Sequence, residues 1–120
     1  MSGPVVLIVD DHAGFRKVAR RMLESSGFVV EEAATGAEAI ALTSSERPDL
    51  VLLDIQLPDI DGFEVARRLD ATAPPPIVVL TSGREPSEYG SRVETAPSAG
   101  FVPKDRLSAR ALRALLGSAQ

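Results

Sequence analysis

Short apolar runs rich in β-branched residues alternate in this chain with segments whose apolar residues recur at helical spacing. The runs at 5–9, 50–53 and 77–80 contain no polar position, which predicts strands buried on both faces. Shorter, weaker strands are expected at 28–30 and 101–102. Strands that alternate with helices favour an α/β fold, with a parallel sheet covered by helices on both faces and right-handed crossovers.

The helical segments between these strands are bounded by glycine, proline or polar loops. They are expected around residues 15–23, 36–41, 63–69 and 107–115. Their apolar faces should include Phe15, Val18, Ala19, Met22 and Leu23; Ala37, Ile40 and Ala41; and Leu107, Ala111, Leu112 and Leu115. The segment 86–95 is a poor helix candidate because it is short and flanked by prolines, and Pro97 should end it early.

A length of 120 residues is typical of one domain, so we expect residues 1–120 to share a single core. The chain has no cysteine, which excludes thiolate metal sites, thiol catalysis and disulfides. No apolar run approaches ~18 residues, and the first residues do not resemble a secretory signal. We therefore expect a cytoplasmic location and no membrane association.

The formal net charge is −4, which argues against binding nucleic acid by neutralising its phosphates. Positive charge does gather locally on one helical segment, at Arg16, Lys17, Arg20 and Arg21. This cluster is either an ordinary solvated helix face or a surface on which a partner docks.

Polar residues that buried strands rarely tolerate stand at the carboxyl ends of the predicted strands. These ends carry, in chain order, Asp10 and Asp11, Asp54, Thr81 and Ser82, and Lys104. In an open parallel sheet all of these ends lie on one edge, which is where ligands bind. Each residue alone has an ordinary explanation as a helix cap, a turn residue or a solvated charge. Their coincidence at one edge indicates a site.

Three carboxylates in one place repel one another, and a hard divalent cation would remove that cost. Mg²⁺ prefers oxygen ligands and keeps several waters, so a few carboxylates and a backbone carbonyl suffice to hold it. Such an ion also neutralises charge in phosphoryl transfer, for which a carboxylate can itself be the nucleophile. The pattern therefore points to a magnesium-assisted aspartyl phosphate.

Four segments of the chain resemble the receiver domains of two-component response regulators. They read VLIVDDH, LVLLDIQLPDIDGFEVARRL, VVLTSG and GFVPKD, and the resemblance covers essentially the whole chain. It implies a flavodoxin-like fold with strand order 2-1-3-4-5. It also implies a phosphorelay switch, and not an enzyme that turns over external substrates. The donor would be a sensor histidine kinase or a phosphotransfer protein, with Mg²⁺, or Mn²⁺ in its place, as the cofactor.

The same resemblance assigns roles to individual residues. Asp54 would be the phospho-acceptor, and Lys104, Thr81 and the neighbouring Ser82 would contact the phosphoryl group, with Thr81 as the switch hydroxyl. The metal site would consist of Asp10, Asp11 as a direct ligand, Asp54 and the backbone carbonyl of Gln56. Phe101 would be the rotating aromatic, and Gln56 and Gly83 would tune the rate of dephosphorylation.

The chain departs from the family's pattern after the lysine, where Asp105 stands in place of a common cis proline. A non-proline cis bond costs roughly 2.5–4 kcal/mol, so the isomer of the Lys104–Asp105 peptide stays open. The DDH and VPKD segments look like receivers of helix-turn-helix transcription regulators, an analogy that is no evidence of DNA binding. Homodimerisation on phosphorylation is compatible with the resemblance. The chain would be either a stand-alone receiver or one separated from an effector domain.

Two other functions compete with the phosphorelay switch. A magnesium-dependent phosphatase with an aspartyl nucleophile would need a general acid two residues after Asp54, where Gln56 cannot serve. A receiver-like interaction module that works without phosphate is disfavoured by the full set of site residues. Incubation with magnesium and a small phosphodonor, followed by intact mass measurement, separates this module from the phosphorelay switch, and turnover of a generic phosphate ester tests for the phosphatase.

Overall fold

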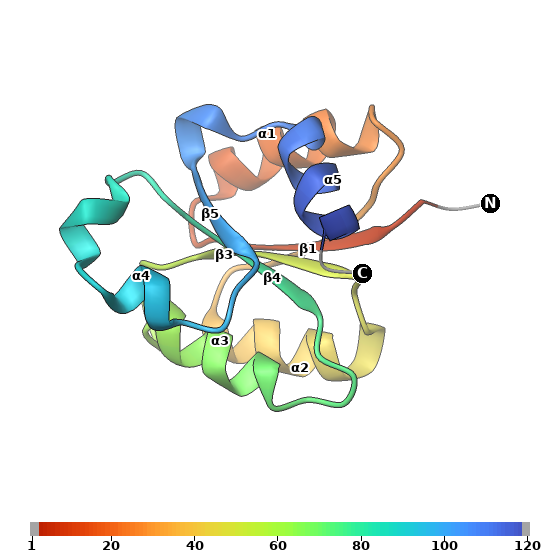
Figure 1. Ribbon diagram of the computed structural model, residues 1–120. Helices are drawn as coiled ribbons and strands as arrows, with labels where there is room; N and C mark the ends of the chain where they lie inside the picture. The colour runs from red at the N-terminus through yellow and green to blue at the C-terminus, as the bar shows by residue number, and fades with distance from the viewer. Residues whose placement is uncertain (1–2, 119–120) are drawn as a thin grey trace.

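The computed structural model describes residues 3–118, which form a five-stranded parallel sheet in the order β2-β1-β3-β4-β5 (Figure 1). The predicted fold class and strand order are confirmed. The strands are β1 Val5–Val9, β2 Val29–Ala33, β3 Leu50–Asp54, β4 Ile77–Ser82 and β5 Gly100–Pro103. The weak strands expected at 28–30 and 101–102 are longer in the structure, because pairing with neighbouring strands extends them, and β2 matches all five residues of β1.

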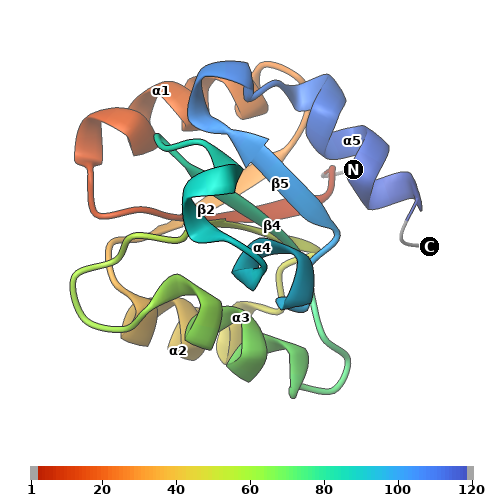
Figure 2. The same cartoon turned by 60° about the vertical axis from the view of Figure 1, so that its left-hand side comes forward.

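Helices cover both faces of the sheet, with α1 and α5 on one face and α2 and α3 on the other (Figures 1 and 2). The helices are α1 Ala13–Glu24, α2 Gly36–Glu46, α3 Gly62–Asp70, α4 Arg92–Thr95 and α5 Ala109–Ser118, with 3₁₀ turns η1 Pro86–Tyr89 and η2 Lys104–Arg106. The poor fourth helix is confirmed: α4 has four residues and ends before Pro97.

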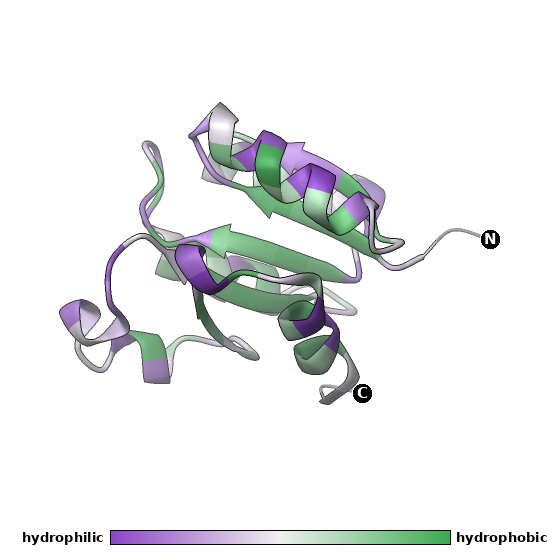
Figure 3. Cartoon of the chain, turned by 90° about the horizontal axis from the view of Figure 1, so that it is seen from above, coloured by the Kyte–Doolittle hydropathy of each residue, from purple (hydrophilic) through white to green (hydrophobic). Residues whose placement is uncertain are grey.

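The core forms two layers, one on each side of the sheet. Strand β3 is buried at all five positions, and its alternate side chains enter the two layers. The central strands are correspondingly apolar along their length, while the helices alternate apolar and polar patches (Figure 3). This burial on both faces explains why a polar side chain at a strand end is held in a fixed place.

Three details of the expected helix faces are wrong. Val18 was placed on the inner face but is 68% exposed, because Ala19 and Leu23 are the residues of α1 that face the sheet. In α2 the buried positions include Ala39, so Ala37 and Ala41, each two residues from it along the helix, face solvent. Leu107, expected in the last helix, precedes α5, which begins at Ala109 after the η2 turn.

The structure also shows the isomer of the Lys104–Asp105 peptide bond, which the sequence leaves open. Within residues 3–118, the cis peptide bond is Ala73–Pro74, and the Lys104–Asp105 bond is trans. The η2 turn begins at Lys104 and contains Asp105, which stands where many relatives carry proline. Lys104 is therefore placed at the carboxyl edge of the sheet without a cis peptide bond after it.

Candidate functional site

Two carboxylates and one ammonium group from three different strand ends meet at the carboxyl edge of the sheet. Asp10 follows β1 and Asp54 ends β3, and both side chains are buried. Lys104, which follows β5, places its Nζ 2.6 Å from Asp10 Oδ2 and 3.2 Å from Asp54 Oδ2. The contact with Asp10 is an ion pair and not a directed hydrogen bond. The predicted convergence of these residues is confirmed in the geometry.

The protonation of this cluster is set by burial and by its own charges. Burial raises the pKa of Asp54 to about 6 and the negative charge of Asp10 adds to the rise, while the backbone N–H of Gln56 and Lys104 oppose it. Burial also acts to raise the pKa of Asp10, but Lys104 and the backbone N–H of His12 hold that pKa below its ordinary value. Near neutral pH both carboxylates are therefore predominantly ionised around one ammonium group.

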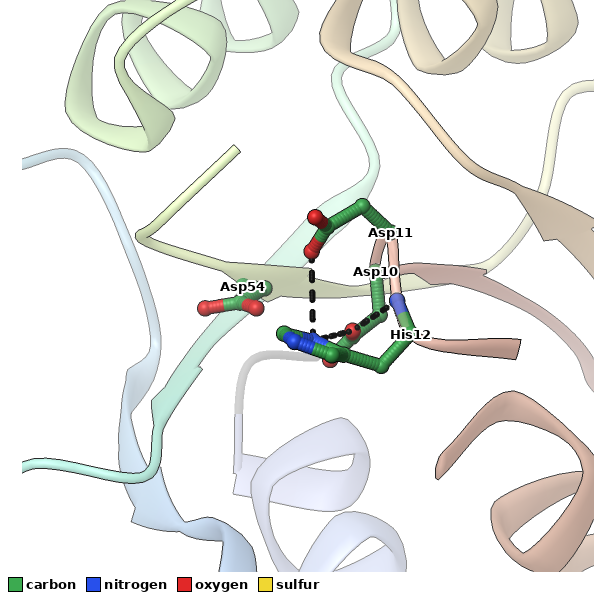
Figure 4. A group of neighbouring side chains, drawn as sticks. All are labelled: Asp10, Asp11, His12 and Asp54. Carbon is green, nitrogen blue, oxygen red and sulfur yellow. Dashed lines mark hydrogen bonds and ion pairs between the residues drawn. The ribbon is translucent and has the colours of Figure 1, made fainter. Parts of the chain in front are cut away.

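Asp11 and His12 complete a group of possible metal ligands at this edge (Figure 4). One ligand atom from each of Asp10, Asp11, His12 and Asp54 lies within 4.8 Å of the others. His12 Nδ1 is 3.1 Å from Asp10 Oδ1 and 3.2 Å from Asp11 Oδ1. The donor set is dominated by carboxylate oxygens, the ligands a hard cation such as Mg²⁺ prefers, so the residues fit that ion.

The two hydroxyl groups that end β4 lie beside the cluster, but each bonds elsewhere. Thr81 is paired in register with Asp54, and its Oγ1 donates a 2.6 Å hydrogen bond to the carbonyl of Val102. Ser82 Oγ lies 2.6 Å from the hydroxyl of Tyr89 and accepts from the backbone N–H of Arg84. Neither hydroxyl therefore bonds to Asp54 in this state.

Of the remaining predicted residues, one contacts the acceptor directly. Gln56 is exposed, and its backbone N–H donates a 3.0 Å hydrogen bond to Asp54 Oδ1. Gly83 is exposed, and a Cβ built there meets no atom within 4 Å. Phe101 is half-buried against the core layer that contains Val9 and Leu53.

The loop between β3 and α3 owes its shape to Asp59, Asp61 and Gly62. Asp59 accepts hydrogen bonds from the N-terminal N–H groups of α2, and Asp61 caps α3 by accepting from Phe63 N. Gly62 lets the start of α3 lie directly against the backbone of Ile55, because a Cβ at position 62 would lie 2.5 Å from the Cα of Ile55. These contacts fix the position of the loop that follows Asp54.

Sequence reasoning missed residues of α1 that support the site. The ring of Phe15, expected to be a core residue, lies 4.6 Å from Lys104 Nζ, an arrangement that favours the cation. Arg16 donates to the carbonyl of Asp10 and, together with Arg20, pairs with Glu32. Half of the basic cluster therefore has internal partners, which a charge pattern on one helix cannot reveal.

Comparison with known proteins establishes the family of this chain. Residues 6–116 match the response regulator receiver domain, and the chain belongs to that family. Domains of this family are, in general, phospho-acceptor switches of two-component systems and not classical enzymes.

Individual relatives agree with this assignment. Two proteins named response regulator MprA, from Mycolicibacterium vanbaalenii and Mycobacterium ulcerans, are 41% and 40% identical over 116 residues, which is 92% of this chain and 49% of each relative. The chain thus spans about half the length of these curated relatives.

Solved structures of response regulators are similar to this chain as well. The signal receiver domain of the response regulator NarL from Mycobacterium tuberculosis is 32% identical, with a TM-score of 0.84 over 99% of this chain and 98% of that one. Chemotaxis response regulator CheY4 of Vibrio cholerae, at 23% identity, has a TM-score of 0.83 over 99% of this chain and all of its own, and shares the fold. Within residues 3–118, no helix has the length and apolar character needed to cross a bilayer.

Proposed function

We propose that this receiver accepts a phosphoryl group on Asp54 from the phosphohistidine of a sensor kinase or phosphotransfer protein. The observation that carries the proposal is the buried Asp54 carboxylate beside Asp10 and Lys104 at the open edge of the sheet. An oxygen of Asp54 would form a bond to phosphorus while the N–P bond of the donor breaks, and the imidazole of the donor would leave with the electron pair.

The acidic residues of the cluster would hold a divalent cation. Asp11 and Asp54 would supply carboxylate oxygens, Gln56 its backbone carbonyl, and Asp10 a carboxylate close by. When bound, Mg²⁺ would neutralise charge that builds up on the transferring phosphoryl oxygens. Lys104, held near both buried carboxylates, would hold one of the remaining oxygens after transfer.

The phosphorylated state would differ from the present one at the end of β4. Thr81 would exchange the carbonyl of Val102 for a phosphoryl oxygen, and Phe101 would turn inward into the space this change creates. The surface of α4, β5 and α5 would then change and be read by a partner, by a second copy of this chain, or by a further part of a longer protein. The lengths of the relatives are compatible with the last of these routes.

The direct test is incubation of the purified protein with a small acyl phosphate such as acetyl phosphate, followed by intact mass measurement. The parent should gain one phosphoryl group in Mg²⁺ and none in excess EDTA. Asp54→Asn should gain none, because an amide is not a nucleophile. A stoichiometric gain in Asp54→Asn would refute the assignment of the acceptor, and no gain in the parent would contradict the proposed function.

A further inference from the structure

The η1–α4 segment is tied to the rest of the molecule by four side-chain contacts. The Tyr89 hydroxyl lies 2.6 Å from Ser82 Oγ, and Arg92 Nη2 lies 2.5 Å from Asp61 Oδ2. Arg92 also sits 4.3 Å above the ring of Phe63, and the rings of Phe63 and Tyr89 meet edge to face at 5.8 Å. Tyr89, Arg92, Phe63, Asp61 and Ser82 form one connected group, which we call the latch.

Ser82 and Asp61, which anchor the latch, both lie close to the acceptor, one across the sheet and one along the chain. Ser82 directly follows Thr81, which pairs with Asp54 across β3 and β4. Asp61 is the N-cap of α3, at the end of the loop that begins at Gln56. The latch therefore connects the segment to both sides of the site, through contacts that do not involve Phe101.

Outside the latch, the segment is held by a local hydrogen bond from the backbone N–H of Glu85 to the Glu88 carboxylate and by partial burial. Turn η1 and helix α4 have four residues each, far fewer than a helix needs to be stable alone, and neither contains a fully buried residue. Tyr89 and Val93 are partly buried against one core layer. Figure 2 shows the segment beside α3, toward the sheet edge that holds β5. Its position thus depends strongly on the few contacts of the latch.

We propose that the latch holds the η1–α4 segment in the unphosphorylated state and is released by phosphorylation of Asp54. The inference rests on the proposed function and adds a specific route for its output. When the Thr81 hydroxyl leaves Val102 for the phosphoryl group, the adjacent Ser82 is displaced and its bond to Tyr89 is lost. Because coupling between two sites is reciprocal, weakening the latch must favour the phosphorylated conformation.

The test uses beryllium fluoride, a non-covalent mimic of the phosphoryl group, at saturating Mg²⁺. Tyr89 is the single tyrosine of the chain, and the chain has no tryptophan, so tyrosine fluorescence reports the latch alone. In the parent, the mimic should change this fluorescence. Arg92→Gln and Tyr89→Phe should bind the mimic more tightly by roughly two- to fivefold, measured by NMR titration, as expected for contacts of this type.

Arg68→Gln is the matched control. Arg68 is 52% exposed and pairs with Glu64 on α3, while Arg92 is 54% exposed, so both substitutions remove one exposed ion pair. The control should bind the mimic with parental affinity. Thermal unfolding of each variant separates a loss of folding from a loss of coupling.

The outcomes distinguish the latch from the proposed function. A parent that binds the mimic without a change in tyrosine fluorescence, or latch variants with the affinity of Arg68→Gln, would overturn the latch alone. A parent that accepts neither the mimic nor a phosphoryl group would overturn both. Tighter binding in the two latch variants, with parental affinity in the control, supports the latch.

Discussion

The acceptor cluster and the η1–α4 segment lie side by side but are built in opposite ways. Asp10 and Asp54 are fully or almost fully buried at the ends of strands that pair with neighbours on both sides. The segment consists of two four-residue pieces, and the ion pair between Arg92 and Asp61 that helps to hold it is largely exposed. Chemistry that needs oxygen atoms in fixed places sits on the rigid part, and a surface that must change sits on the part with the fewest buried contacts.

This contrast has an energetic consequence. An exposed ion pair such as Arg92–Asp61 contributes at most about 1 kcal/mol, so a modest local change suffices to break it. Removing Lys104 would leave the buried carboxylates of Asp10 and Asp54 without their ammonium partner, which costs several kcal/mol. Substitutions should therefore have large effects in the first region and graded effects in the second.

The largest effect is expected for metal binding at the rigid region. Asp11→Ala should lower Mg²⁺ affinity by roughly 10- to 100-fold, because a hard cation loses an anionic oxygen ligand. Isothermal titration calorimetry of the folded variant measures this change. Asp70→Ala, which removes an exposed acid at the end of α3, is the control. Parental affinity in Asp11→Ala would refute the role proposed for Asp11.

The next effect concerns stability and its dependence on pH. A pKa of Asp54 raised to about 6 means that the folded state binds this proton more tightly than the unfolded state, whose value is about 4. Ionisation of Asp54 therefore destabilises the folded protein as pH rises from about 4 to 6, and the cost is complete above that range.

Asp54→Asn removes that ionisation and should stabilise the metal-free protein by about 1–2 kcal/mol at pH 7.5. The advantage should shrink as pH falls below 6 and vanish below about pH 4, where Asp54 becomes neutral in both states. Urea unfolding of parent and variant in EDTA, across this pH range, gives the difference directly. A variant less stable than the parent at pH 7.5 would contradict the raised pKa.

The smallest effect is a few-fold change in the lifetime of the phosphorylated state, controlled from the exposed rim. Gln56→Leu should slow dephosphorylation, because an apolar side chain would exclude water from the exposed position beside Asp54. The measurement is the loss of phosphoprotein over time after donor removal, at fixed Mg²⁺. Gln56→Asn, which keeps the amide, is the control and should decay at nearly the parental rate.

Gly83 offers a second position on the same rim. Space around it is open, so Gly83→Lys is sterically allowed and would place bulk and charge near the site. It should also alter the decay rate, while Gly83→Ala should alter it less. If Gln56→Leu and Gly83→Lys both decay like the parent, these positions do not control hydrolysis in this chain.

The rigid region was predictable from sequence, and much of the second region was not. A continuous apolar run that ends in Asp10 or Asp54 places the carboxylate at a strand end, and parallel topology brings such ends together. No comparable rule pairs Arg92 with Asp61, because the two side chains are far apart in sequence and both are partly exposed.

Errors in the helix faces have a related cause. Val18 lies one position from the buried Ala19, and the sequence alone does not fix which of two adjacent apolar residues turns inward. The support that Phe15 and Arg16 give to Lys104 and Asp10 depends on how α1 packs against β1 and β2. Such contacts follow from tertiary packing and leave no periodic signal in the chain.

Hydrogen exchange measured by mass spectrometry, with and without Mg²⁺ and beryllium fluoride, tests the contrast between the two regions most directly. On binding the mimic, amides of residues 84–96 should exchange faster, while those of β1 and β3 should keep their protection. Unchanged exchange in 84–96, or loss of protection spread equally over β1 and β3, would contradict a rigid acceptor coupled to a loosely held output segment.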